Sequence, residues 1–147
     1  MVNIYDVACY ILDKKPNITT MKLQKLCYYA QAWSLAWDDV PLFEEDFQAW
    51  ANGPVCYELY TKHRGHYIAE SKLFADFSSG EEFNQTQIDT LDAVIRDYGN
   101  DSPHYLSELT HSERPWKETR GSLNLGESSN EIIKKELMQE YYGGLIA

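Results

Sequence analysis

The stretch between Thr20 and Tyr60 holds the densest run of apolar and aromatic residues in the chain, and it constrains the fold more than any other segment. Lys22 and Lys25 make one side of its first half polar, but its second half is apolar on most sides. A helix of this kind belongs in the middle of a protein, so we expect a central buried helix from about Thr20 to Asp38. Its main buried face is predicted from apolar residues at helical spacing, namely Leu23, Leu26, Cys27, Ala30, Trp33, Ser34 and Trp37.

The pattern changes after this helix. Phe47 to Ala51 fits a short strand within an extended connection. The Gly53-Pro54 pair predicts a tight turn, with Gly53 at positive φ and Pro54 as the first residue of the next helix. That helix would place on its inner face Val55, Cys56, Leu59 and Tyr60.

Four more segments carry helical spacing or helix start signals, at about residues 4–15, 85–98, 103–109 and 129–141. Thr61 to Gly80 is expected to form a loop or a short hairpin, and Thr110 to Arg120 a polar loop around Pro115-Trp116. We therefore predict that residues 1–147 form one compact, all-α or α-dominated domain. It should contain five or six helices around a central buried helix, with at most a short β-hairpin.

Composition narrows the classes of partner. Among the 147 residues, 23 acidic and 13 basic side chains give a net charge of −10. Such a charge repels phosphate backbones and suits a basic protein partner, so we expect no binding to nucleic acid. The alternative, that the acidity serves only solubility, stays open at this point.

The same chain lacks the apolar run of about 18 residues that a membrane span needs, and its first residues do not read as a signal peptide. Its cysteines, Cys9, Cys27 and Cys56, are odd in number and fall on predicted apolar faces. We expect them to be free, buried thiols in a reducing cytoplasm, with no membrane partner.

His111 and Glu113 form the pattern most able to support catalysis, because a histidine with a carboxylate two residues away can do acid–base work. No nucleophile elbow or paired-carboxylate spacing accompanies them. We therefore expect no catalytic residue, with His111 hydrogen-bonded to backbone and Trp116 anchoring the segment. The run His63–His66 lacks the four ligands of a structural zinc site, and no nucleotide-binding glycine motif is present, so we expect no metal and no cofactor.

Three segments resemble the signature of the Panacea antitoxin family, which includes SocA-like proteolytic adaptors and phage-associated GepA-like proteins. They are LQKLCYYAQA (23–32), PLFEEDFQAWANGPV (41–55) and LTHSERPW (109–116). The resemblance runs from about Ile4 to about Tyr142. It implies a mainly helical protein that binds and neutralises a cognate toxin encoded beside it in a bacterial or prophage toxin–antitoxin system. For SocA-like members it also implies delivery of the toxin to a bacterial protease.

The resemblance selects nine signature positions for partner binding. The Gly53-Pro54 turn and the Pro115-Trp116 segment each join a rigid backbone to an aromatic neighbour, a combination that protein interfaces favour. Whether these residues contact the toxin or hold the fold together is left open, and an enzyme that uses His111 and Glu113 remains the alternative from another class. The nine candidates are Lys25, Tyr28, Trp50, Gly53, Pro54, His111, Glu113, Pro115 and Trp116.

Overall fold

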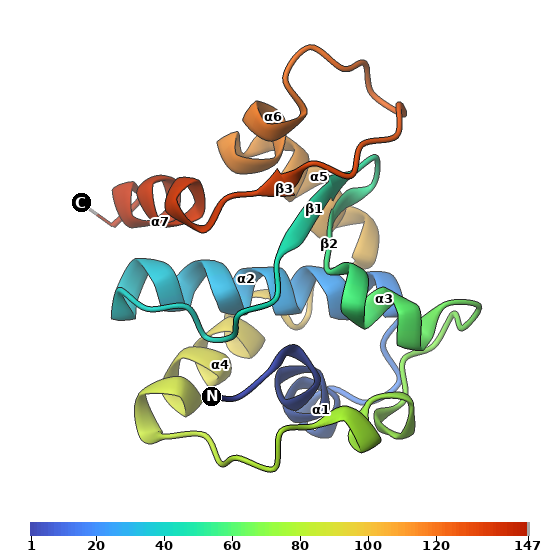
Figure 1. Ribbon diagram of the computed structural model, residues 1–147, viewed down its shortest axis with the longest axis vertical. Coiled ribbons are helices and arrows are strands. Elements are labelled where there is room, and N and C mark those ends of the chain that lie inside the picture. The colour runs from blue at the N-terminus through green and yellow to red at the C-terminus, as the bar shows by residue number, and fades with distance from the viewer. Residues whose placement is uncertain (147) are drawn as a thin grey trace.

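The computed structural model describes residues 1–146 and places one long helix at its centre (Figure 1). This helix, α2 (Thr20–Asp38), begins where the Thr19 side chain accepts a hydrogen bond from the backbone N–H of Lys22. It ends at Asp39, whose backbone is left-handed. Side chains on nearly all sides of α2 are buried, so the predicted central helix is confirmed. Trp37, expected on the inner face, is 41% exposed because it lies in the last turn.

Helices from both ends of the chain pack against α2. In Figure 1, α1 and α4 lie on one side of it, and α7 lies on the other beside the small sheet. The described residues hold seven α-helices, one more than the upper number expected, within an α-dominated fold as predicted. Besides α2 they are α1 (Ile4–Lys14), α3 (Tyr57–His63), α4 (Gln85–Tyr98), α5 (Pro103–Ser112), α6 (Arg114–Arg120) and α7 (Lys135–Gly144).

The additional helix is α6, in the segment expected to be a polar loop. Pro115 lies in its first turn, where a residue without a backbone N–H is well tolerated. Thr61 to Gly80 also differs from expectation. It holds the end of α3 and two short 3₁₀ helices, η1 (Ser71–Leu73) and η2 (Ala75–Phe77), and no hairpin forms there.

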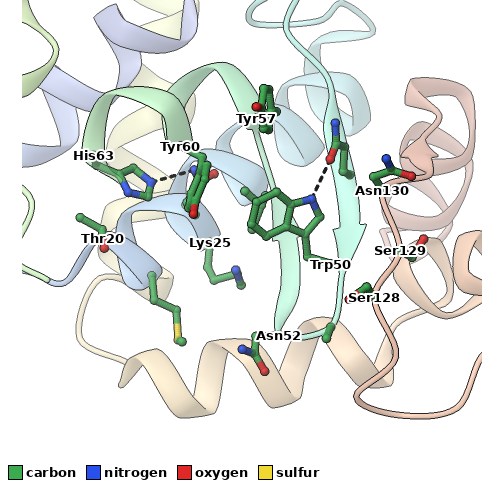
Figure 2. Close-up of a pocket in the computed structure, with 15 residues that line it drawn as sticks. Thr20, Lys25, Trp50, Asn52, Tyr57, Tyr60, His63, Ser128, Ser129 and Asn130 are labelled. Carbon is green, nitrogen blue, oxygen red and sulfur yellow. Dashed lines mark hydrogen bonds between the residues drawn. The ribbon is translucent and has the colours of Figure 1, made fainter. Parts of the chain in front are cut away.

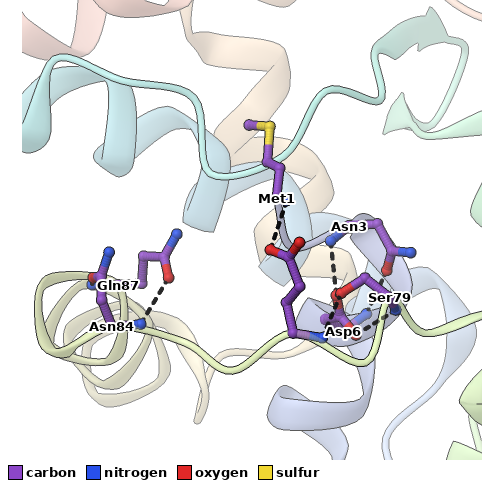
Figure 3. A network of polar contacts seen from close by, with 7 residues as sticks. Met1, Asn3, Asp6, Ser79, Asn84 and Gln87 are labelled. Carbon is purple, nitrogen blue, oxygen red and sulfur yellow. Dashed lines mark hydrogen bonds and ion pairs between the residues drawn. The ribbon is translucent and has the colours of Figure 1, made fainter.

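A network around Asp6 fixes the start of the chain (Figure 3). The Asp6 carboxylate accepts hydrogen bonds from the backbone N–H of Asn3 and from the backbone and hydroxyl of Ser79. In return the Asn3 side chain accepts from the backbone N–H of Asp6, which completes a capping box on α1. The amino terminus forms an ion pair of 2.6 Å with Glu81. The connection before α4 is therefore held against the N-terminal end of α1.

Three short strands form an antiparallel sheet in the order β2-β1-β3. They are β1 (Phe47–Trp50), β2 (Gly53–Val55) and β3 (Ile132–Ile133). The strand expected near Phe47 is confirmed, but Pro54 does not begin a helix. It pairs with Ala49 in β2, an edge strand, where a residue without a backbone N–H is tolerated.

The C-terminal part of the chain joins this sheet before it forms its last helix. Ile133 pairs with Phe47 of β1, so the segment after Ser129 is extended and α7 begins only at Lys135. Cys9, Cys27 and Cys56 are free thiols, as expected; Cys27 and Cys56 are buried and Cys9 is half-buried. No helix within residues 1–146 has the length and apolar character needed to cross a membrane.

Candidate functional site

A cleft of about 920 Å³ opens between the first turns of α2, the β1–β2 hairpin and α3 (Figure 2). The segment that precedes β3 closes its far side. The cleft is lined by Thr20, Met21, Gln24, Lys25, Gln48, Trp50, Ala51, Asn52, Val55, Tyr57, Tyr60, His63, Ser128, Ser129 and Asn130.

Lys25 lies at the floor of this cleft, although the sequence pattern put it on a polar side of α2. Its side chain is only 1% exposed, and its Nζ donates a hydrogen bond of 2.9 Å to the carbonyl oxygen of Pro54. No carboxylate among residues 1–146 lies within ion-pair distance of this ammonium group. Burial lowers the pKa of Lys25 to about 7, because the charged form loses its hydration. Near neutral pH, Lys25 is therefore poised between its charged and uncharged forms.

Gly53 makes the room that Lys25 occupies. A Cβ atom at position 53 would lie 2.5 Å from Cε of Lys25 and 3.0 Å from Oγ1 of Thr110. The φ angle of Gly53 is 117°, a conformation that residues with side chains resist, so the predicted positive φ is confirmed. Lys25, Gly53 and Pro54 thus form one structural unit, in which the missing side chain of Gly53 leaves space for Lys25 and the Pro54 carbonyl accepts a hydrogen bond from it.

Gln24 connects the cleft floor to α3. Its Oε1 accepts from the backbone N–H of Cys56 at 2.8 Å, and its Nε2 donates to the Cys56 carbonyl at 3.1 Å. Because the Cys56 N–H can only donate, the orientation of the amide is fixed, and Nε2 faces Nε2 of His63 at 3.0 Å. His63 therefore accepts at Nε2 and carries its proton on Nδ1. Burial lowers the pKa of His63 to about 4, so the ring is neutral at physiological pH.

Aromatic side chains form one wall of the cleft. The rings of Trp50 and Tyr60 meet edge to face at 4.9 Å, and the Trp50 indole N–H donates to the Gln48 side chain at 2.7 Å. Tyr57, at the start of α3, is 48% exposed at the rim. The wall is thus rigid near Trp50 and open to solvent near Tyr57.

Helix α6 supports this wall from behind. The indole N–H of Trp116 donates to the Trp50 carbonyl at 2.8 Å, and Arg120 donates to the Ala49 carbonyl at 2.9 Å. The same guanidinium group donates to the carbonyls of Asn124 and Glu127. Arg120 therefore holds both β1 and the loop that leads to the Ser128–Asn130 side of the cleft.

Comparison with known families decides the affiliation of the chain. The family described as "Antitoxin SocA-like, Panacea domain" matches residues 23–117. The chain belongs to this SocA-like antitoxin family. The matched range is shorter than the resemblance suggested, and it excludes β3, α7 and the Ser128–Asn130 side of the cleft. No curated protein and no solved structure matched the chain.

In this SocA-like protein, four of the nine signature positions meet at the cleft. Lys25 and Trp50 line it, and Gly53 and Pro54 shape it through Lys25. Trp116 contacts the back of β1, and Pro115 lies in the first turn of α6.

His111 and Glu113, considered as an acid–base pair, face different neighbours. The His111 ring stacks on Trp116 at 4.0 Å, its Nε2 is buried without a hydrogen-bond partner in the described residues, and burial lowers its pKa. Glu113 Oε1 instead accepts from the hydroxyls of Tyr29, at 2.7 Å, and Tyr142, at 2.9 Å. The Tyr142 hydroxyl also lies 3.1 Å from that of Tyr28. Glu113 and Tyr28 are therefore parts of a buried tyrosine cluster between α2 and α7, and no His111–Glu113 hydrogen bond forms.

Sequence reasoning missed the other residues that shape the cleft. Gln24 lies inside a signature segment but gives no signal of its own, because a glutamine on a helix usually faces solvent. His63 was considered only as a metal ligand, and no group of three or more potential ligands occurs in the part of the chain that the structure describes. The Ser128–Asn130 segment reaches the cleft through the pairing of β3 with β1, which no local pattern reveals.

Proposed function

We propose that this SocA-like protein is an antitoxin that neutralises a cognate toxin by direct, stoichiometric binding, and that the cleft and its rim form part of the binding surface. The main support is the membership of a family of antitoxin-like proteins, which are generally not enzymes and act on protein partners. The cleft adds a concave surface shaped by signature residues, with an exposed aromatic rim of the kind that interfaces use.

The arrangement of polar groups supports binding over catalysis. The histidine and the carboxylate that could have formed an acid–base pair face different neighbours and are both held within the fold. The net charge of −10 supports a basic toxin as the partner. Delivery of that toxin to a protease, as the resemblance to SocA-like adaptors implies, would need a second contact surface and is kept as the alternative.

To test this proposal, the purified protein is mixed with the purified product of the neighbouring gene in the absence of any protease, and toxin activity is measured. We expect toxin activity to disappear near an equimolar ratio, with a stable complex on size-exclusion chromatography. Protection at a small fraction of the toxin concentration would show catalysis and refute the proposal. Binding without protection, followed by protection once the host protease is added, would favour the adaptor.

A further inference from the structure

We propose that the cleft around Lys25 binds a carboxylate carried by a polypeptide segment of the partner, with the Lys25 ammonium group as its charged recognition element. The carboxylate can belong to an Asp or Glu side chain or to a chain terminus. The identity of the partner rests on the function proposed above, but the chemistry of the site stands on the contacts of Lys25 itself.

Acidic side chains are unevenly distributed between the cleft and the rest of the chain. The chain has 23 acidic residues among 147, yet none of the fifteen residues that line the cleft is an aspartate or a glutamate. The charged or titratable nitrogen groups that line it are those of Lys25 and His63. In a protein of net charge −10, this is a local region that does not repel an anion.

Lys25 has unused hydrogen-bonding capacity. An ammonium group has three N–H donors, and only the Pro54 carbonyl accepts from it among the described residues. Figure 2 shows the nitrogen directed into the cleft between Trp50 and Asn52. A buried cation without an anion is costly, whereas a paired one forms short, charge-assisted hydrogen bonds. A carboxylate entering beside the exposed Asn52 would supply that anion.

The size and the walls of the cleft suit a peptide. A cleft of about 920 Å³ is much larger than one carboxylate needs, and the Trp50, Tyr57 and Tyr60 rings give it apolar sides. Those sides suit the carbon atoms of a peptide, while Asn52 and Asn130 offer amide groups to its backbone. A peptide segment with an acidic residue beside an apolar one therefore fits better than a free inorganic anion.

Binding of such a segment should be linked to proton uptake. A neighbouring carboxylate favours the ammonium form, so Lys25 would bind a proton when a complex forms above about pH 7. The other titratable groups around Lys25 are Tyr57, Tyr60 and His63 in the cleft, with His111 acting on it from α5. Burial lowers the pKa of both histidines, so they are neutral above pH 7 and do not compete with this signal.

The first experiment needs no toxin. The whole protein is used to select from a synthetic heptapeptide pool at pH 6.5, and the selected peptides are remade with Glu→Gln or Asp→Asn and with an amidated C-terminus. We expect a shared carboxylate beside an apolar residue, and binding at least about tenfold weaker when it is removed or when the protein carries Lys25→Met. Loss upon amidation alone would identify a C-terminal carboxylate. Selection of peptides without a shared carboxylate, or of none, would overturn the proposal.

The second experiment uses the complex with the neighbouring gene product. Calorimetry in buffers of different ionisation enthalpy should show proton uptake by the wild type at pH 8, with affinity falling by up to about tenfold per pH unit above 7. Lys25→Met should abolish the uptake, and exposed Lys72→Met should retain it. If a complex forms without proton uptake, the carboxylate site is refuted and the antitoxin proposal stands. If no complex forms, the proposed function is refuted, and the peptide experiment alone tests the carboxylate site. Because proton uptake is measured on the wild type, a misfolded Lys25→Met protein would not obscure the result.

Discussion

Gln24 and Gln31 lie seven residues apart on α2, and each holds a passing backbone segment through both ends of its amide. Gln24 binds the N–H and the carbonyl of Cys56. Gln31 accepts from the backbone N–H of Leu42 and donates to the carbonyl of Phe43, each at 2.7 Å. Both side chains are buried. Their amide groups therefore supply the hydrogen-bond partners that the buried backbone groups of these connecting segments need.

Gln31→Leu should destabilise the protein strongly, because it leaves the Leu42 N–H and the Phe43 carbonyl buried without partners. We expect a loss of about 1–3 kcal/mol in the free energy of unfolding for each group, measured by urea denaturation. The control is Gln85→Leu at an exposed position in the first turn of α4, which should change stability by no more than about 0.5 kcal/mol. Equal effects of the two substitutions would contradict the role assigned to Gln31.

Gly53→Ala should destabilise the fold through both its positive φ and its approach to Lys25. Backbone strain alone costs about 1–3 kcal/mol, so we expect a larger loss than this in the free energy of unfolding. Gly65→Ala provides the matched control, since its φ is 85° and no atom lies within 4 Å of the added Cβ. The difference between the two variants isolates the contact with Lys25. Combining Gly53→Ala with Lys25→Ala should recover part of that difference, and strict additivity would argue against the contact.

The pH dependence of stability should report the burial of Lys25. Its pKa of about 7 in the folded state lies below the unfolded value of about 10.4, so the unfolded chain binds more protons between these values. The wild type should therefore gain stability relative to Lys25→Met as the pH rises from 7 to 10, by up to about 1.4 kcal/mol per unit. If the free energies of unfolding of the two proteins change in parallel across this pH range, the Lys25 ammonium group is hydrated in the folded state.

Glu113 should give the opposite trend at acidic pH. Burial raises its pKa above the ordinary value of 4.5, against the lowering effect of the Tyr29 and Tyr142 hydrogen bonds. The folded state then binds more protons, so the contribution of Glu113 to stability falls as the pH rises from about 4 through its folded pKa. We expect Glu113→Gln to become progressively more stable relative to the wild type over this range, by urea denaturation. If the wild type instead becomes more stable than Glu113→Gln as the pH rises, the hydrogen bonds from the tyrosine hydroxyls outweigh burial and lower the pKa of Glu113.

The net charge of −10 should accelerate association with a basic toxin. Such attraction acts on the association rate and is screened within about 8 Å at physiological salt. Stopped-flow measurements should therefore show an association rate that falls clearly with added salt, while the dissociation rate changes little. An association rate that does not depend on salt concentration would indicate that the acidic surface serves solubility alone.

The central helix and the helix-dominated fold were predictable because α2 is long and its apolar positions recur at a regular spacing. The short elements were not. β3 has two residues and exists because Ile132 and Ile133 pair with Gln48 and Phe47, far away in the chain. This pairing delays the start of α7 to Lys135, several residues later than the spacing predicted, and places Met138 and Tyr142 in the core.

The candidate site was predictable only in part, for a similar reason. The signature drew attention to Lys25, Trp50, Gly53 and Pro54, but helical spacing alone placed Lys25 toward solvent. Its burial depends on Gly53, which comes from another element and leaves the space that Lys25 fills. Side-chain positions of this kind follow from close packing between segments that are distant in sequence, so a local sequence pattern does not predict them.

The place of β3 and α7 in the chain also has a consequence for translation. The ribosome makes the chain from its N-terminus, so the tyrosine cluster lacks Tyr142, and β1 lacks its second neighbour, until nearly everything else described has been made. A message interrupted before these elements would yield a product with an unfilled centre and an open sheet edge, well suited to recognition by proteases. Synthesis must therefore pass α7 before the fold can close, so the supply of folded protein depends on translation reaching at least Tyr142.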